Sequence, residues 1–431
     1  MHDTDKAVRS TVAKISWRIL PLIGLGYLVS LMDRINVSFA ALQMNADLGF
    51  SASIYGFGAG LLYLSYAAFE VPSNILLVRF GARRWLARIM ITWGVIAACM
   101  MFVRTPTQFY IMRFLLGAAE AGFVPGVIYY LTRWFPSAHR GRAISRFYIA
   151  GPLGSAVLVG AISGPLLEMD GLAQLEGWQW LFLLQGSPAV VIGFLLLRYL
   201  PESPEHASWL SPDEKSWLTR ELASDEARIG TPAAHSVAAA LLNPLVLQLG
   251  LIGFLMIGSM VTLALSAPLL LRDATGLAPS QIGWIVSTGG ILGSACMLFA
   301  GWYSDRRGER FTTLVVSSVL MGSAFLLMAF GPSSAVVVGG YLLFGLSWSS
   351  VTLSHISLWP DVLHIRVLAV GGAAVNSMSQ IGAFLMPYAW GFARDSTGSF
   401  QSGLIGLSIA MLLTVIFTLV LRRQVPRGEA S

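Results

Sequence analysis

The sequence predicts an all-α membrane protein whose twelve transmembrane helices form two halves of six. The first observation is the composition: 55% of the 431 residues are hydrophobic and only 12% are charged, whereas soluble globular proteins carry about 25% charged residues. The second is a series of apolar runs near the about 20 residues that cross a bilayer. The third is the concentration of Lys and Arg in alternate loops. Together they predict a multi-pass protein in a lipid bilayer.

The apolar runs, separated by glycine, proline and charged residues, give twelve spans. The spans cover residues 17–39, 53–77, 85–103, 109–131, 143–166, 178–200, 244–271, 281–302, 312–330, 335–357, 367–392 and 400–421. An even number of spans places both termini on the same side of the membrane.

The distribution of Lys and Arg indicates which side this is. With the N-terminus inside, the inner segments hold 23 of the 28 Lys and Arg residues, and the outer loops hold three, Arg104, Arg272 and Arg394. Inner loops of membrane proteins are enriched in these residues, so both termini are expected to be cytoplasmic. The same bias explains the net charge of +6, and no nucleic-acid partner is expected.

The longest polar stretch, 201–243, divides the chain into an N-terminal half, 1–200, and a C-terminal half, 244–431. A short amphipathic helix is expected inside it, with Ser211 as the N-cap and Glu214 completing a capping box. We expect a cytoplasmic linker helix without a chemical role.

Charged residues inside the predicted spans occur only in the N-terminal half. Asp33 and Arg34 lie in the first span, and Arg113 and Glu120 lie in the fourth. A charge at the bilayer centre costs at least about 2.5–3.5 kcal/mol, so such residues usually face a water-filled path for ions or substrate. The halves repeat weakly at an offset of 227 residues. At that offset the second half carries uncharged residues, namely Met260 for Asp33, Gly340 for Arg113 and Ser347 for Glu120.

These four charged residues suggest two functions, anion binding and proton transfer. A guanidinium matches a carboxylate with two parallel hydrogen bonds and stays protonated, so Arg34 is the candidate clamp for an organic anion. Buried carboxylates can exchange protons near neutral pH, so Asp33 and Glu120 are the candidate proton carriers. Arg113 lies two helical turns from Glu120 and is expected to pair with it. The alternative is that the four residues form two structural ion pairs that fix helix packing.

Several weaker features border these spans. Tyr66 can donate to a substrate oxygen or serve as a packed aromatic residue, and Asn376 can bind substrate or only join helices. Glu70 is expected in a cytoplasmic gate network with loop arginines. His355 is expected at the membrane interface rather than as a second proton site.

No motif for chemistry on a bound cofactor is present. The sequence contains no Walker motif, no metal-ligand spacing and no nucleophile elbow. We therefore expect no enzyme activity, no metal and no cofactor, with a proton gradient as the energy source. Cys99 and Cys296 lie in apolar runs and are not expected to form a disulfide.

Several stretches together resemble the anion:cation symporter family of the major facilitator superfamily. They are Leu31–Val37, Arg113–Gly126, Val71–Asn74, Trp134–Pro136 followed by Arg140–Arg142, and Pro201–Pro204 with Trp209–Ser211. The resemblance implies two six-helix halves with a substrate site between them. It also implies inward transport of tartrate, sugar acids, phthalate or similar organic acids with protons.

The resemblance also implies roles for single residues. Asp33 and Glu120 match the family's protonation sites, Arg34 its carboxylate-binding arginine, Tyr66 a pocket tyrosine and Asn376 a hydroxyl-binding asparagine. Arg113 matches the arginine of the fourth span.

A loop signature of the superfamily is similar to residues 301–310, which places Asp305 and Arg306 at a cytoplasmic gate. Arg79 stands at the matching place in the first half, where Val78 replaces the acidic residue.

We therefore expect a proton-coupled importer of a small organic anion, acting as a monomer in the inner membrane of a bacterium. A major facilitator antiporter or drug exporter is the main alternative. An organic-acid sensor that moves nothing is a third, disfavoured because the sequence shows no output domain. The sequence leaves open which acid is carried, the proton stoichiometry, import versus exchange, and the roles of Asp361, His364 and Arg366.

Overall fold

The structure is a computed structural model that describes residues 2–229, 243–307, 310–363 and 365–424. Its regular elements in these ranges are helices, joined by short turns. They are α1 (His2–Asp47), α2 (Ala52–Phe80), α3 (Ala82–Cys99), α4 (Pro106–Glu120), α5 (Phe123–Thr132), α6 (Ser137–Leu167), α7 (Gly177–Tyr199), α8 (Pro212–Ile229), α10 (Pro244–Thr275), α11 (Pro279–Arg307), α12 (Arg310–Phe330), α13 (Ser334–Val362), α14 (Ile365–Thr397) and α15 (Gln401–Gln424). Short 3₁₀ helices occur at Met100–Phe102, Leu172–Gln174 and Pro204–His206.

The predicted all-helical fold is confirmed. Within the described residues, ten helical segments are long and apolar enough to cross a membrane. The predicted spans 143–166 and 367–392 coincide with α6 and α14. All twelve predicted spans therefore fall on helices, and the count of twelve membrane crossings stays a prediction.

The predicted fourth span is not one continuous helix. It is broken between α4 and α5, where Gly122 has a φ of +85°. Pro125 has no backbone N–H to donate to the carbonyl of Ala121, so a continuous helix would lose a hydrogen bond here. A Cβ atom on Gly122 would also overlap the Ser73 side chain of α2. The helix therefore breaks directly after Glu120.

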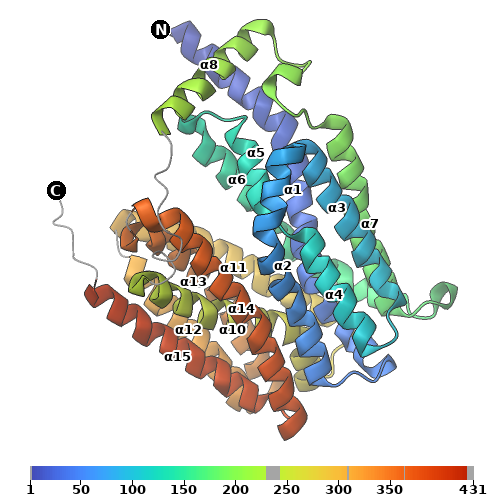
Figure 1. The fold of residues 1–431 in the computed structure, drawn as a ribbon. Helices are drawn as coiled ribbons and strands as arrows, with labels where there is room; N and C mark the ends of the chain where they lie inside the picture. The colour runs from blue at the N-terminus through green and yellow to red at the C-terminus, as the bar shows by residue number, and fades with distance from the viewer. Residues whose placement is uncertain (1, 230–242, 308–309, 364, 425–431) are drawn as a thin grey trace.

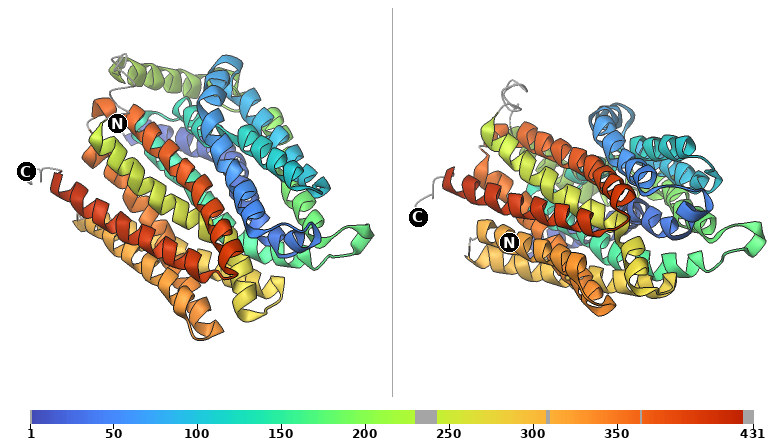
Figure 2. Two further views of the ribbon diagram at one scale, coloured as in Figure 1. Left: turned by 60° about the horizontal axis from the view of Figure 1, so that its bottom comes forward. Right: turned by 90° about the horizontal axis from the view of Figure 1, so that it is seen from below.

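The helices gather into two groups, which we call the N-terminal bundle (α1–α7) and the C-terminal bundle (α10–α15). Figures 1 and 2 show the two bundles side by side, with α2 next to α14. Glycine permits the close approach of these two helices, because a Cβ on Gly56 would overlap the carbonyl of Pro387. Similarly, α6 meets α11 where Gly160 faces Gly283.

The two ends of the molecule differ in how they join the bundles. We call the end that carries α8 the linker end and the opposite one the hairpin end. At the hairpin end, the carboxylate of Asp395 accepts hydrogen bonds of 2.9 Å from the backbone N–H groups of Ala52 and Ser53 at the start of α2. Arg272 donates to the carbonyl of Leu42 at 2.7 Å. Toward the linker end the ribbons of the two bundles diverge (Figure 1).

The predicted linker helix is present as α8, with the predicted capping box. The Ser211 N–H donates to Oε2 of Glu214 at 2.7 Å, and the Glu214 N–H donates to Oγ of Ser211 at 3.2 Å. Lys14 of α1 forms a 2.9 Å ion pair with Glu214, and Asp225 accepts hydrogen bonds from Ser137 at the start of α6. These contacts attach α8 to the N-terminal bundle (Figure 1).

Candidate functional site

A buried ion pair joins the first and fourth predicted spans. Nε of Arg34 donates to Oε1 of Glu120 at 2.8 Å, and Oγ of Ser30 donates to the same oxygen at 2.6 Å. Ser30 and Arg34 are four residues apart on α1, so they present their side chains to α4 from one face. The Arg34 guanidinium also lies over the Tyr66 ring, 4.6 Å from its centroid. The structure thus brings together three of the residues that the sequence predicts.

The other carboxylate oxygen of Glu120 is unsatisfied. Oε2 is buried and has no hydrogen-bond partner among the described residues. The whole residue is only 1% exposed. Leaving such an acceptor unpaired is costly. Oε2 can therefore still accept a hydrogen bond from a donor that enters the site. Glu120 is the last residue of α4, so the helix break follows it directly.

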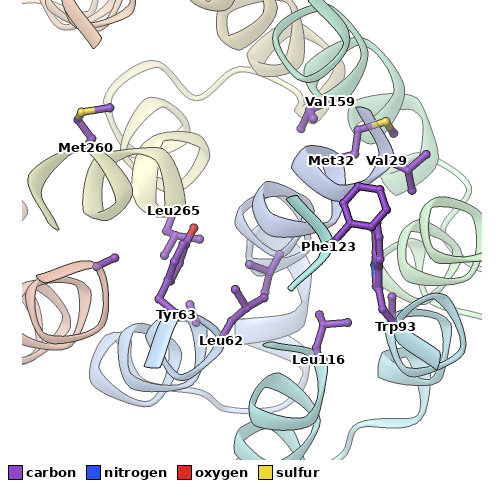
Figure 3. Close-up of a cluster of buried hydrophobic side chains, with 14 of the residues drawn as sticks. Val29, Met32, Leu62, Tyr63, Trp93, Leu116, Phe123, Val159, Met260 and Leu265 are labelled. Atoms are coloured by element: carbon purple, nitrogen blue, oxygen red, sulfur yellow. The ribbon is translucent and has the colours of Figure 1, made fainter. Parts of the chain in front are cut away.

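Asp33 lies beside Arg34 in sequence but on a different side of α1. Its Oδ2 accepts a 2.5 Å hydrogen bond from Nε1 of Trp93 on α3, and its Oδ1 accepts one of 3.1 Å from Nδ2 of Asn36. Trp93 packs edge-on against Phe123, the first residue of α5, as Figure 3 shows. Asp33 is therefore a second, separate carboxylate site inside the N-terminal bundle.

Arg113 does not pair with Glu120, so that prediction is wrong. Nη2 of Arg113 donates to the carbonyl of Ala59 on α2 at 3.1 Å, and its Nε and Nη1 are buried without partners among the described residues. Seven residues of helix rise about 10 Å, so Arg113 and Glu120 lie two turns apart along α4, and Glu120 pairs with Arg34 instead. Arg113 is fully buried, and the charges of Glu120 and Asp33 both act on it.

Only one of the four charged side chains has appreciable exposed surface. The Arg34 side chain is 17% exposed, whereas Asp33, Arg113 and Glu120 are 2% exposed or less. Arg34 is therefore the group of the four with surface left for a ligand.

Asn376 lies across the bundle boundary from Glu70. Its Nδ2 donates to Oε2 of Glu70 at 3.3 Å, which joins α14 to α2. Among the described residues, Glu70 makes no contact with a loop arginine, and the charge of Arg34 acts on it; the expected gate network stays a prediction. Asn376 is thus held at the edge of the Arg34 site by a carboxylate.

The predicted gate of Asp305, Arg306 and Arg79 is not tested by the contacts that the structure describes. Arg79 is exposed and lies over the ring of Phe80. Arg306 is also exposed, and the side chain of Asp305 lies outside the described residues. A different ion pair, missed by the sequence analysis, joins Arg310 to Asp361 at 2.9 Å at the linker end. The gate role of the three residues stays a prediction.

His355 is buried inside the C-terminal bundle, and its expected place at the membrane interface stays a prediction. It is 2% exposed, and its Nε2–H donates to the carbonyl of Leu249 on α10 at 3.1 Å.

The sequence analysis also missed Ser30, Asn36 and Trp93. Helical spacing could have found the first two, since Ser30 precedes Arg34 by four residues and Asn36 follows Asp33 by three. Within the described part of the chain, no three His, Cys, Asp or Glu side chains lie close enough to hold a metal ion.

Comparison with known proteins gives matches over almost the whole chain. The sequence family described as the Major Facilitator Superfamily matches residues 23–387 and 249–431. A protein named "Putative tartrate transporter" from Agrobacterium vitis is 42% identical over 428 residues, which cover 99% of this chain and 94% of that protein. A "Quinolone resistance transporter" from Acinetobacter baumannii is 35% identical over 423 residues, covering 98% of this chain and 97% of that protein.

A solved structure shares the fold. It is the crystal structure of a bacterial homolog of the human lysosomal transporter Spinster, in an inward-facing and occupied conformation. Its TM-score is 0.75 at 13% sequence identity, and the match covers 96% of this chain and 98% of that one.

Proposed function

Because this chain belongs to the Major Facilitator Superfamily of membrane transporters, we propose that it imports a small organic anion together with protons, by alternating access. The observation that carries the proposal is the Arg34–Glu120 pair. Its arginine is the most exposed of the four intramembrane charged groups, and its carboxylate has an oxygen without a hydrogen-bond partner among the described residues. A proton on Glu120 weakens its hold on Arg34, which frees the guanidinium to bind a substrate carboxylate.

The charge balance of the N-terminal bundle supports this coupling. Arg34 and Arg113 carry two positive charges, and Asp33 and Glu120 carry two negative charges when both are ionised. The group is then neutral, and an added anion would leave uncompensated buried charge, which is costly. Each proton taken up by Asp33 or Glu120 adds one positive charge, so protonation and anion binding favour each other.

The bundle arrangement supports alternating access. We propose the division into residues 1–200, 201–243 and 244–431, with the two halves rocking around the Arg34 site. Opening at the hairpin end then requires loss of the Asp395 contacts to α2.

The placement of the chain in the membrane is also proposed. The Lys and Arg bias supports twelve crossings with cytoplasmic termini. We propose the bacterial inner membrane as the location, a monomer as the working unit, and Asp305, Arg306 and Arg79 as a cytoplasmic gate.

The substrate we propose is tartrate or a sugar acid, because a relative that matches 99% of the chain is named for tartrate. Two protons with a monoanion would carry one net positive charge. At about 100 mV, inside negative, this adds roughly 2.3 kcal/mol of driving force. Two protons with a dianion would be electroneutral.

Uptake by proteoliposomes tests the proposal. An inward proton gradient is imposed, and tartrate, galactonate, glucuronate, phthalate, 4-hydroxyphenylacetate and nicotinate are offered in turn. We expect one acid to accumulate and the accumulation to collapse with a protonophore. No accumulation of any acid by folded protein would contradict import.

Drug export is the second candidate, because the match to a relative named for quinolone resistance extends over 97% of that relative. Everted vesicles distinguish the two. An exporter would accumulate the drug inside them when the proton gradient is imposed, whereas an importer would not.

A further inference from the structure

Glu70 on α2 is a carboxylate that the transport proposal above does not use. Its Oε2 accepts the 3.3 Å hydrogen bond from Nδ2 of Asn376 on α14. Glu70 follows Tyr66 by four residues, so it lies about one helical turn nearer the linker end, on the same face of α2. The amide that would bind a substrate is thus already bonded to a carboxylate of the protein, across the boundary between the bundles.

The charged and titratable neighbours of Glu70 come from the helices around the Arg34 site. The charge of Arg34 on α1 acts on Glu70, and Glu70 in turn acts on Tyr66 of α2 and Tyr148 of α6. Asn376 faces it from α14. Arg34 therefore contacts Glu120 at 2.8 Å and acts on Glu70 through its charge alone among the contacts that the structure describes. Electrostatically, Glu70 belongs to the same site.

An ionised Glu70 opposes anion binding. Its negative charge comes in addition to a group of two arginines and two ionised acids whose charges already cancel. It also accepts the hydrogen bond from Nδ2 of Asn376, which is then not free to bind substrate. A hydrogen bond to an ionised acceptor is about twice as strong as one to a neutral acceptor. A proton on Glu70 therefore removes the repulsion and weakens the hold on Asn376 at the same time.

We propose that Glu70 and Asn376 form a proton-operated latch between the two bundles, with Glu70 as a third proton-carrying carboxylate of the transport site. The inference rests on the proposed proton-coupled anion transport. In the empty protein, ionised Glu70 holds the Asn376 amide. When an organic anion binds, Glu70 takes up one proton and releases Asn376, whose Nδ2–H₂ then donates to the substrate.

Proton counting on the purified full-length protein tests the latch. Proton uptake per bound acid is measured in weakly buffered detergent solution at saturating concentrations of the acid that wild-type protein transports, and Kd is measured against pH. Glu70→Gln keeps an oxygen that accepts from Asn376 but cannot take up a proton. We expect it to take up one proton fewer than wild type. Its Kd should also change with pH less steeply than that of wild type, by about tenfold less per pH unit. Glu221→Gln, the same change on the exposed face of α8, should match wild type.

A second variant approaches the latch from the other side. Asn376→Leu leaves Glu70 in place but removes the hydrogen bond that favours its ionised form, so fewer protons should be taken up on binding than in wild type. The double variant should lose no more of the proton count than Glu70→Gln alone. If wild type takes up protons when the acid binds, and neither variant changes the number of protons per bound acid, the latch is overturned and the transport proposal stands. A wild-type protein that binds none of the six acids would overturn the transport proposal and the latch with it.

Discussion

The two bundles contain corresponding helices, but they satisfy their buried polar groups differently. In the N-terminal bundle, Glu120 is bonded by Ser30 and Arg34 from another helix and still has an unpaired oxygen. At the corresponding place in the C-terminal bundle, Ser347 donates to carbonyls of its own helix, at 3.1 and 3.0 Å. The C-terminal bundle packs without buried opposite charges at these places. Helix packing alone therefore does not require them, which favours a functional role in the N-terminal bundle.

The same contrast holds at Asp33. Its counterpart Met260 accepts a weak 3.6 Å contact from Thr352, whereas Asp33 accepts a 2.5 Å hydrogen bond from Trp93. We infer a division of labour, in which the N-terminal bundle provides the proton and anion chemistry. In this proposal the C-terminal bundle provides the opposite side of the substrate site and the Asn376 amide.

The largest expected effect follows from removing the proton site at Glu120. A glutamine amide cannot take up or give up a proton, so Glu120→Gln should reduce gradient-driven uptake at least about 100-fold, while counterflow of labelled substrate persists. Proteoliposome uptake and counterflow on the same preparation measure both. If counterflow is lost as well in folded protein, Glu120 serves binding rather than coupling, and the contrast between the bundles needs another explanation.

Arg34→Lys should have the next largest effect. The lysine keeps a positive charge but loses the planar group that bonds two oxygens. Loss of a hydrogen bond to a charged group costs about 1.5–3 kcal/mol, which corresponds to a Kd roughly 10- to 150-fold higher. Arg84→Lys, at an exposed position of α3, is the matched control. An unchanged Kd in Arg34→Lys would show that the substrate carboxylate binds elsewhere.

The helices and the buried charges were predictable from the sequence, whereas the pairing of the charges was not. Hydropathy and breakers locate the apolar runs, and the cost of intramembrane charge identifies Asp33, Arg34, Arg113 and Glu120. Adjacent residues on a helix point about 100° apart, so Asp33 and Arg34 face different neighbours. Which neighbours these are depends on tertiary packing.

Two further features show the same limit. The break after Glu120 had a signal in Gly122 and Pro125, which the apolar pattern of the fourth span concealed. The contact between Glu70 and Asn376 joins residues 306 positions apart. Only the packing of α2 against α14 brings them together, and a single sequence does not encode that register in a local pattern.

A matched pair of serine variants compares the bundles directly. Ser30→Ala removes a 2.6 Å hydrogen bond to the Glu120 carboxylate, and we expect uptake to fall about tenfold. Ser347→Ala removes only bonds to its own helix backbone, which stabilise helices little, so uptake should stay within about twofold of wild type. Initial uptake rates, normalised to folded protein, decide between these outcomes. Equal losses in both variants would remove the distinction drawn here between the bundles.

The smallest effect is expected at the linker end, where α8 is attached to the N-terminal bundle through Lys14 and Glu214. Partial burial acts to raise the pKa of Glu214, but the Ser211 N–H and the Lys14 ammonium outweigh it, and the net pKa is lowered from 4.5. A carboxyl group with a lowered pKa stabilises the fold above its unfolded pKa, and this contribution disappears as the pH falls through the folded value. Glu214→Gln should therefore lower the unfolding free energy by at most about 1 kcal/mol at pH 7. The difference from wild type should shrink toward zero as the pH falls below about 4. Thermal unfolding of both proteins at pH 7 and below about pH 4 measures this stability difference. A difference that persists at low pH would mean that the capping geometry, not the charge of Glu214, holds α8 in place.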